Sequence, residues 1–237
     1  MVRGAAFATD AVGYHASLAF GWEQRYRRPS FKARERILQK SLEGHDVAGT
    51  LWLDAGCGTG TLSRCLAERG CRVMGFDGAT EMIRIAVQHC ISHRCHDRLA
   101  FARVDSLASL PIPDVSVDGV LCSSVLEYVG SPKDCLAEFR RVLKPAGHLL
   151  VSVPNRKSMV RHMQLAAHRL GKAFASGCFD FLQYSRHQYS AREFENLLSQ
   201  FGFTVRKILP FGSPLPKLAE RSSPWASLLM FAANKSA

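Results

Sequence analysis

The sequence lacks the features that mark membrane-spanning, repeat and secreted proteins. It contains no run of about 18 apolar residues, so we expect no helix that crosses a membrane. It has no internal repeat, low-complexity tract or linker, which argues against a solenoid or a disordered chain. Residues 1–20 are mildly apolar, but Asp10 and His15 interrupt them, and we do not expect a secretory signal there.

Paired cysteine spacings are also absent. The eight cysteines are scattered, several of them inside apolar runs, as free core thiols are. They are Cys57, Cys65, Cys71, Cys90, Cys95, Cys122, Cys135 and Cys178. This pattern favours a reducing compartment, so we expect a cytoplasmic protein. The segment HCISHRCH (89–96) is rich in His and Cys, but ligands so close in sequence cannot all converge, and we expect no metal site there.

Acidic residues are scarce relative to basic ones. The chain has 31 Lys and Arg against 20 Asp and Glu, which gives a net charge of +11. The excess is concentrated in residues 156–190, where the net charge is +5, and in residues 200–237, where it is +4. A positive net charge bears on the partners of a protein and not on its fold. Four interpretations stay open: an anionic substrate, a membrane surface, RNA, or only a solvated face.

From residue 51 onward, short apolar runs alternate with amphipathic ones. The predicted strands are 50–56, 71–77, 99–105, 117–125, 148–154, 203–211 and 225–233. The predicted helices between them are 61–70, 79–90, 132–144 and 190–203, the last opened by a capping box of Ser190 and Glu193. This alternation predicts an α/β fold, a doubly wound and mostly parallel seven-stranded sheet, in one domain of residues 1–237.

The segment LDAGCGTG (53–60) places three glycines between a predicted strand and a predicted helix. The dinucleotide fingerprint needs its third glycine at position 61, which is Thr; the chain has Gly60 instead. Asp54, at the end of the strand, would repel a diphosphate but could pair with an ammonium group. The loop therefore predicts a ligand other than a diphosphate.

Two further carboxylates follow the next strands. Asp77 closes the strand 71–77, where a carboxylate suits the two hydroxyls of a ribose. Asp105 closes the strand 99–105 and could accept from an exocyclic amine. Together with Asp54, these acids suit a nucleoside with a positively charged amino-acid-like tail and no phosphate. Ser123 and Ser124 close the fourth strand.

After LDAGCGTG, four further segments follow in this order: GFD, RVDS, SVDGVLCSSVLEYV and LKPAGHLLVSVPN. Together they resemble the class I S-adenosylmethionine-dependent methyltransferases over about residues 50–155. The resemblance implies a Rossmann-like methyltransferase fold, S-adenosyl-L-methionine as cofactor, and a set of cofactor-binding residues. The residues implied beside the methionine part are Asp54, Gly56, Cys57, Gly58 and Gly60. Asp77 and Gly78 would lie at the ribose, and Asp105 and Ser106 at the adenine. Ser123 would lie near the methionine carboxyl or the sulfonium, and Arg34 or Arg36 would meet the methionine carboxylate.

The catalytic residues are less well defined. Family members that methylate hydroxyls of quinone precursors often read LEHV where this chain reads LEYV, so Tyr128 replaces their histidine. A tyrosine with a pKa near 10 is a poor base, but it could line the site as a hydrogen-bonding wall or only pack. His187, just before the capped helix, is the other candidate, with a structural role as the alternative. Arg186 beside it could meet an anionic group of the substrate.

Two segments flank the cofactor-binding core of residues 49–155. Residues 1–48 would form an N-terminal helical lid, and its Tyr14, Trp22 and Tyr26 could face the sulfonium. The alternative is a helix that only packs on the sheet. Residues 156–189 form an insert with a basic amphipathic helix. We favour a cap over the substrate pocket; a helix that lies on an anionic membrane is the alternative, and the two are compatible.

We therefore expect an enzyme that transfers a methyl group to an oxygen or nitrogen of a small molecule, for instance a biosynthetic intermediate with an apolar or lipid-like part. Residues 190–237 would complete the domain with a helix and the last strands. One alternative is an RNA methyltransferase, although no RNA-binding module is appended and the fourth strand does not end in an NPPY-like motif. Another is a cofactor-binding subunit that has lost catalysis.

Overall fold

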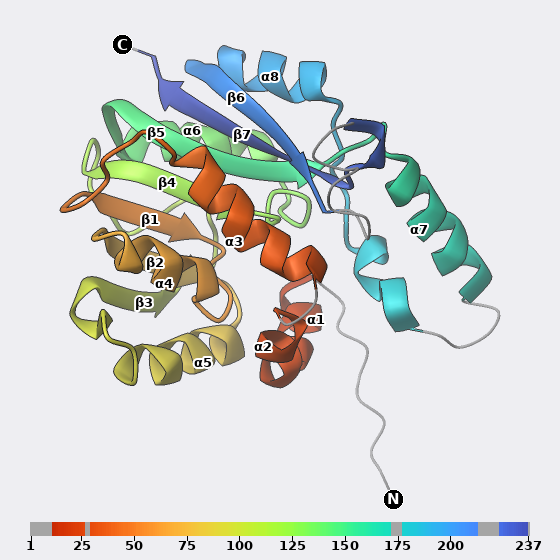
Figure 1. Ribbon diagram of the computed structural model, residues 1–237, viewed down its shortest axis with the longest axis horizontal. Helices are drawn as coiled ribbons and strands as arrows, with labels where there is room; N and C mark the ends of the chain where they lie inside the picture. Colours follow the sequence, from red (N-terminus) through yellow and green to blue (C-terminus); the bar gives the residue numbers. More distant parts are fainter. Residues whose placement is uncertain (1–10, 27–28, 172–176, 213–222, 237) are drawn as a thin grey trace, which may run out of the picture.

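The structure, a computed structural model, describes residues 11–26, 29–171, 177–212 and 223–236. These residues form a seven-stranded sheet with helices on both faces (Figure 1). The strands are β1 (Leu51–Ala55), β2 (Arg72–Asp77), β3 (Leu99–Arg103), β4 (Val117–Ser123), β5 (Leu143–Pro154), β6 (Phe203–Phe211) and β7 (Leu228–Lys235). The helices are α1 (Ala11–Leu18), α2 (Trp22–Arg25), α3 (Pro29–Ser41), α4 (Thr61–Glu68), α5 (Thr80–Ile91), α6 (Pro132–Val142), α7 (Met159–Gly171) and α8 (Ala191–Gln200). The predicted fold class is confirmed.

The strand order is β3-β2-β1-β4-β5-β7-β6. The first five strands of this order pair in parallel, whereas β7 is antiparallel to both β5 and β6. Parallel neighbours need a crossover connection, which α4, α5 and α6 supply. The order reverses between β1 and β4, and open α/β sheets bind ligands beyond the carboxyl ends of the strands at such a point.

Two apolar clusters fix the helices on the sheet. In one cluster, Leu38 of α3 and Leu66 of α4 pack with Trp52 of β1. In the other, Phe139 of α6 and Phe194 of α8 pack with the inner strands. All five side chains are fully buried. The amphipathic spacing seen in the sequence thus determines which side of each helix meets the sheet.

Several predicted boundaries differ from the structure by a few residues, most clearly the one between α6 and β5. The helix predicted over 132–144 ends at Val142, and β5 already begins at Leu143. The backbone of Leu143 is extended, with φ −71° and ψ 136°, and this residue pairs with Val117 of β4. The sequence pattern predicts that the helix stops at Pro145. Pairing of Leu143 with β4 ends the helix earlier than that.

Helix α7 presents its apolar stripe to solvent. Met159, Met163 and Leu170 are 50%, 64% and 67% exposed. Arg161 and His168, on the other side of the helix, are buried. The helical spacing is as predicted, but the side that packs on the protein carries Arg161 and His168 together with Val160. Figure 1 shows α7 beyond the carboxyl ends of the parallel strands, far from α4 and α5. No helix in the described ranges is long and apolar enough to cross a membrane.

The predicted capping box of α8 is present. Ser190 Oγ accepts from the Glu193 backbone N–H, and the Glu193 carboxylate accepts from the Ser190 backbone N–H at 2.8 Å. Two helix-terminal donors are satisfied in this way.

Replacing Ser190 by Ala removes this cap and should lower the free energy of unfolding by about 1 kcal/mol. Urea denaturation measures the change. Ser199→Ala, at an exposed position of the same helix, is the control and should stay within about 0.5 kcal/mol of wild type. Equal stability of the two variants would show that the cap contributes nothing.

Candidate functional site

A cavity of about 800 Å³ lies beyond the carboxyl ends of β1, β2 and β4. Its wall on the sheet side comes from the glycine loop and from the residues that follow β2, β3 and β4. Helices α1 and α2 and the start of α3 cover it from outside, and α7 contributes at one end. The two segments expected to be lid and cap therefore both border the same space.

The glycine loop needs glycine for steric reasons. Gly56 and Gly60 have φ of 79° and 76°, in the left-handed region. A Cβ on Gly56 would lie 2.3 Å from Val125 Cγ2, and one on Gly60 would lie 2.7 Å from the Phe101 ring. Gly58 also has a positive φ, 54°, but a Cβ there would meet nothing closer than Trp22 Nε1 at 3.7 Å. Gly58 thus turns bare backbone toward the cavity, whereas Gly60 serves the turn into α4 and is absent from the described lining.

Asp54 is a buried carboxyl group that borders the cavity. Its side chain is 2% exposed, and Ser63 Oγ donates to Oδ2 at 2.6 Å. Within the described ranges no cationic side chain forms an ion pair with it. Burial, and to a lesser extent the nearby Asp77, raise the pKa of Asp54 to about 7. A bound cation would relieve this unfavourable burial of charge.

Asp77 holds the loop and the next helix in place. Gly58 N–H donates to Oδ2 at 2.9 Å, and Ala79 N–H donates to Oδ1 at 2.8 Å. Burial raises the pKa of the Asp77 carboxyl, and these two bonds oppose the shift. Each carboxylate oxygen keeps a further lone pair for a ligand hydroxyl. Gly78 lines the cavity next to it.

Asp105 and Ser106 also border the cavity, but in a more open place. The Asp105 side chain is 86% exposed, and Arg103 Nη2 donates to its Oδ1 at 2.6 Å. Ser106 Oγ accepts from the backbone N–H of Ala108 at 3.1 Å. The sequence did not indicate the Arg103 partner, which orients the Asp105 carboxylate at the cavity rim.

The end of β4 brings hydroxyls and a guanidinium together. Ser123 and Ser124 line the cavity, and the Ser124 N–H donates to Ser152 Oγ at 2.8 Å. Arg34 Nη2 donates to Ser124 Oγ at 3.4 Å and its guanidinium lies over the Phe31 ring. Arg34 lines the cavity, whereas Arg36, the other predicted basic residue, is not part of the described lining.

The two predicted catalytic residues are separated by the structure. Tyr128 lines the cavity, and burial raises the pKa of its phenol well above the usual value. His187 is not part of the described lining; its Nε2 lies 3.0 Å from the carbonyl oxygen of Val129. The neighbouring Arg186 N–H donates to the Glu127 carbonyl at 2.8 Å. These bonds tie the segment to the loop after β4.

The aromatic side chains of the N-terminal segment gather at the cavity. Tyr14, Trp22 and Tyr26 all line it. Tyr14 stacks on Tyr184 with ring centroids 4.8 Å apart. Burial raises the pKa of Tyr26 to about 12, so its phenol stays protonated.

Several lining residues were not singled out from the sequence. A buried ion pair joins Arg161 Nη2 of α7 to Glu127 Oε2 at 3.0 Å, and Ser185 Oγ hydrogen-bonds to both partners. The partners are far apart in sequence, so no spacing could reveal the pair. His15 also lines the cavity. The sequence feature that could have identified His15 is its position between Tyr14 and Trp22, two aromatic residues of the predicted lid.

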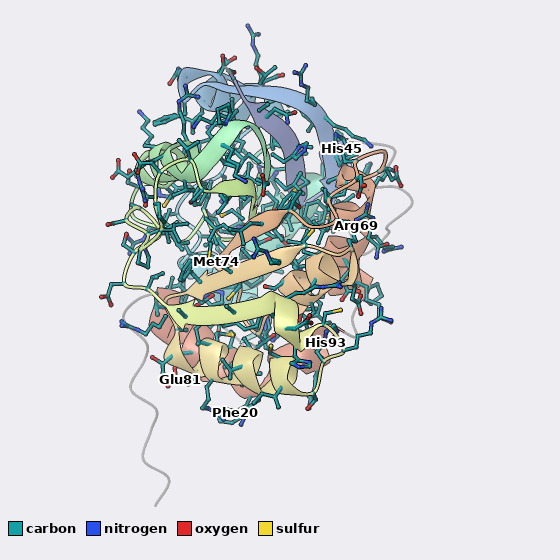
Figure 2. The ribbon with its side chains drawn as sticks, turned by 90° about the vertical axis from the view of Figure 1, so that its left-hand side faces the viewer. Phe20, His45, Arg69, Met74, Glu81 and His93 are labelled. Atoms are coloured by element: carbon teal, nitrogen blue, oxygen red, sulfur yellow. The ribbon has the colours of Figure 1, made fainter. Side chains whose placement is uncertain are left out.

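The His- and Cys-rich segment 89–96 lies elsewhere. His93 Nε2 is 3.5 Å from Glu68 Oε1. Figure 2, which faces the side of the molecule opposite the cavity, shows His93 just beyond the end of α5. Among the described residues, no three His, Cys, Asp or Glu side chains are grouped so that they could hold a metal ion.

Comparisons with known proteins found similar sequences and similar folds. A family model described as a methyltransferase domain matches residues 53–151. Ubiquinone biosynthesis O-methyltransferase of Xylella fastidiosa is 35% identical over 144 residues, which cover 60% of this chain and 54% of the relative. The enzyme of the same name from Idiomarina loihiensis is 38% identical over 135 residues, 55% of this chain and 54% of the relative. The chain thus spans about half the length of the curated relatives it matches.

Solved structures show the same fold. An S-adenosylmethionine-dependent methyltransferase from Mesorhizobium loti aligns with a TM-score of 0.63 at 21% identity, over 84% of this chain and 96% of that one. Magnesium protoporphyrin IX methyltransferase from Synechocystis, solved with S-adenosylhomocysteine, aligns with a TM-score of 0.62 at 18% identity, over 98% and 90%. These findings agree with the resemblance seen in the motifs: residues 53–151 match a methyltransferase domain, and the fold is that of S-adenosylmethionine-dependent methyltransferases.

Proposed function

We propose that this protein transfers the methyl group of S-adenosylmethionine to an oxygen or nitrogen of a small molecule held in the cavity. The observation that carries the proposal is that the glycine loop and three strand-end carboxyl groups line one wall of a cavity whose opposite wall is aromatic. A volume of about 800 Å³ lies within the usual range for ligand pockets, roughly 300–1,000 Å³. It suits the cofactor together with a small acceptor.

The lining residues fit the cofactor part by part. The buried Asp54 would face the ammonium group, and the bare backbone at Gly58 would let the methionine part approach closely. Asp77 would accept from the ribose hydroxyls. Asp105 and Ser106 would meet the adenine, at the open rim where Arg103 already orients the carboxylate. A carboxylate buried without a cation among the described residues supports this placement most strongly.

A cationic side chain also lines the cavity. Arg34, which donates to Ser124 Oγ, would receive the cofactor's carboxylate, and Ser123 lines the same cavity. The cofactor supplies an activated methyl group on a positively charged sulfur. The protein's own contribution would be to hold the acceptor in line with that methyl, which alone supplies much of the rate enhancement. Helices α1 and α2 would exclude water.

The end of the cavity toward α7 suits a polar group of the acceptor. Arg161 is 3% exposed, and its Nε–H has no hydrogen-bond partner among the described residues. Gln164 Oε1 likewise has none in this part of the chain. Both residues line the cavity. An acceptor hydroxyl could satisfy the donor and the acceptor at once. The aromatic lining between these atoms and the glycine loop would contact an apolar part of the acceptor.

We also propose that the exposed face of α7 rests on an anionic membrane surface. Its apolar stripe of Met159, Met163 and Leu170 is open to solvent, and residues 156–179 contain no Asp or Glu. Apolar side chains between basic ones are typical of helices that lie in a membrane interface. Because the other side of α7 borders the cavity, an acceptor with a lipid-like part would have a short path to it.

A mixture of extract small molecules and RNA, supplied with methyl-labelled S-adenosylmethionine, tests the reaction. We expect label in the small-molecule fraction. Label in the RNA fraction would contradict the proposal and favour an RNA methyltransferase. Cofactor binding without transfer to any fraction would favour a non-catalytic subunit.

Replacing Asp77 by Ala should weaken cofactor binding by about 1.5–3 kcal/mol, roughly 10- to 150-fold, because charge-assisted hydrogen bonds to the ribose are lost. Calorimetry with S-adenosylhomocysteine measures the affinity. Asp97→Ala, which removes the same charge from an exposed site, is the control and should bind normally. Equal affinity of both variants would refute this placement of the ribose.

The membrane proposal is tested by co-sedimentation with phosphatidylglycerol vesicles. Met163→Glu should reduce binding by about tenfold or more, since an apolar contact worth roughly 1.5 kcal/mol is replaced by a repelled charge. Ile91→Glu, at an exposed apolar position on α5, should bind like wild type. If wild type does not sediment with the vesicles, or if both variants lose binding equally, α7 is not the docking face.

A further inference from the structure

His15 of α1 lines the cavity and lies against Tyr128. Its ring centroid is 4.7 Å from that of Tyr128, with the rings at 66°. Tyr14 and Trp22 contact the same imidazole edge-on, with centroids 5.3 and 5.7 Å away. Three aromatic rings thus hold the imidazole at the boundary between lid and sheet.

The hydrogen bonding of His15 determines which nitrogen is available. Nδ1 lies 2.7 Å from the carbonyl oxygen of Ala11, one turn earlier in α1. A carbonyl oxygen only accepts, so Nδ1 carries the proton and Nε2 of the neutral ring keeps its lone pair. The structure records no protein partner for Nε2 among the described residues. The nitrogen is therefore available to a ligand in the cavity.

The surroundings keep this ring neutral. Burial lowers the pKa of His15 below its ordinary value, and Arg25 of α2 acts in the same direction. The Ala11 carbonyl and Asp77 of β2 oppose the shift without cancelling it. Tyr128 stays protonated, because burial raises its pKa well above 10. Of the two rings in contact, the imidazole is the one that can accept a proton near neutral pH.

We propose that His15 is the general base of the methyl transfer, brought to the cavity by the lid and held there beside Tyr128. This inference rests on the proposed function. Tyr128 would be a positioning residue that holds the imidazole edge-on. The acceptor's nucleophilic atom would give its proton to His15 Nε2 as it forms a bond to the methyl carbon. The carbon–sulfur bond breaks, its electron pair stays on sulfur, and the imidazolium later returns its proton to water.

The tautomer can be tested without any acceptor. A nitrogen-15 NMR titration of the histidines in the unliganded protein should show His15 as the Nδ1–H tautomer, with a pKa below 6.5. Comparison with His15→Gln assigns the signal. A proton on Nε2, or a pKa above 6.5, would overturn the proposal.

The catalytic role is tested with methyl-labelled cofactor and the extract small-molecule fraction. His15→Gln should slow transfer by about 10²- to 10⁴-fold while S-adenosylhomocysteine affinity, measured by calorimetry, stays within a few-fold. The acid limb of the pH–rate profile should disappear. Imidazole added to His15→Ala should restore part of the rate, which a merely structural role would not produce.

His96→Gln, at an exposed histidine that is not part of the described lining of the cavity, is the matched control and should keep the wild-type rate and pH profile. If wild type transfers label and His15→Gln matches it, the general-base assignment fails while the proposed function stands. If wild type transfers no label to any fraction, the proposed function fails, and the catalytic role of His15 fails with it.

Discussion

The site is organised around a carboxyl group buried at the end of a central strand. Asp54 is the fourth of the five residues of β1, so the apolar packing that fixes the strand also removes this carboxyl from water. One hydroxyl, that of Ser63, bonds to it, and within the described ranges no cationic side chain pairs with it. Burying a negative charge without a cationic partner is unfavourable, and for this reason the pKa of Asp54 is raised. The neighbouring glycines leave room for a cationic ligand group to offset it.

The parallel topology arranges the rest of the cofactor wall. Since β2 and β4 run beside β1 in the same direction, Asp77 and Ser123 reach the same edge of the sheet as Asp54. None of these groups would meet without that register. The opposite wall has a different origin, because α1 and α2 precede the sheet in sequence and add aromatic rings and an imidazole. The methyl donor would therefore bind to the sheet, and the acceptor would bind between sheet and lid.

Much of the core could be predicted from the sequence, because its signals are local. Apolar periodicity predicts the strands, and the glycine loop and the capping box at Ser190 are defined within a few residues. Contacts between distant segments leave no such signal. The Glu127–Arg161 pair and the contact of His15 with Tyr128 depend on how lid and insert fold back on the sheet. Similarly, periodicity finds the stripe on α7 but cannot tell which side faces solvent.

The most direct test of this account is the proton balance of cofactor binding. Because burial raises the pKa of Asp54 to about 7, part of the Asp54 carboxyl is protonated at neutral pH. Pairing with the ammonium group of S-adenosylhomocysteine would lower that pKa, so calorimetry in buffers of different ionisation enthalpy should show net release of protons on binding. Asp54→Asn should lose this release. A binding enthalpy independent of the buffer, or proton release that persists in Asp54→Asn, would contradict the central role of the buried carboxyl.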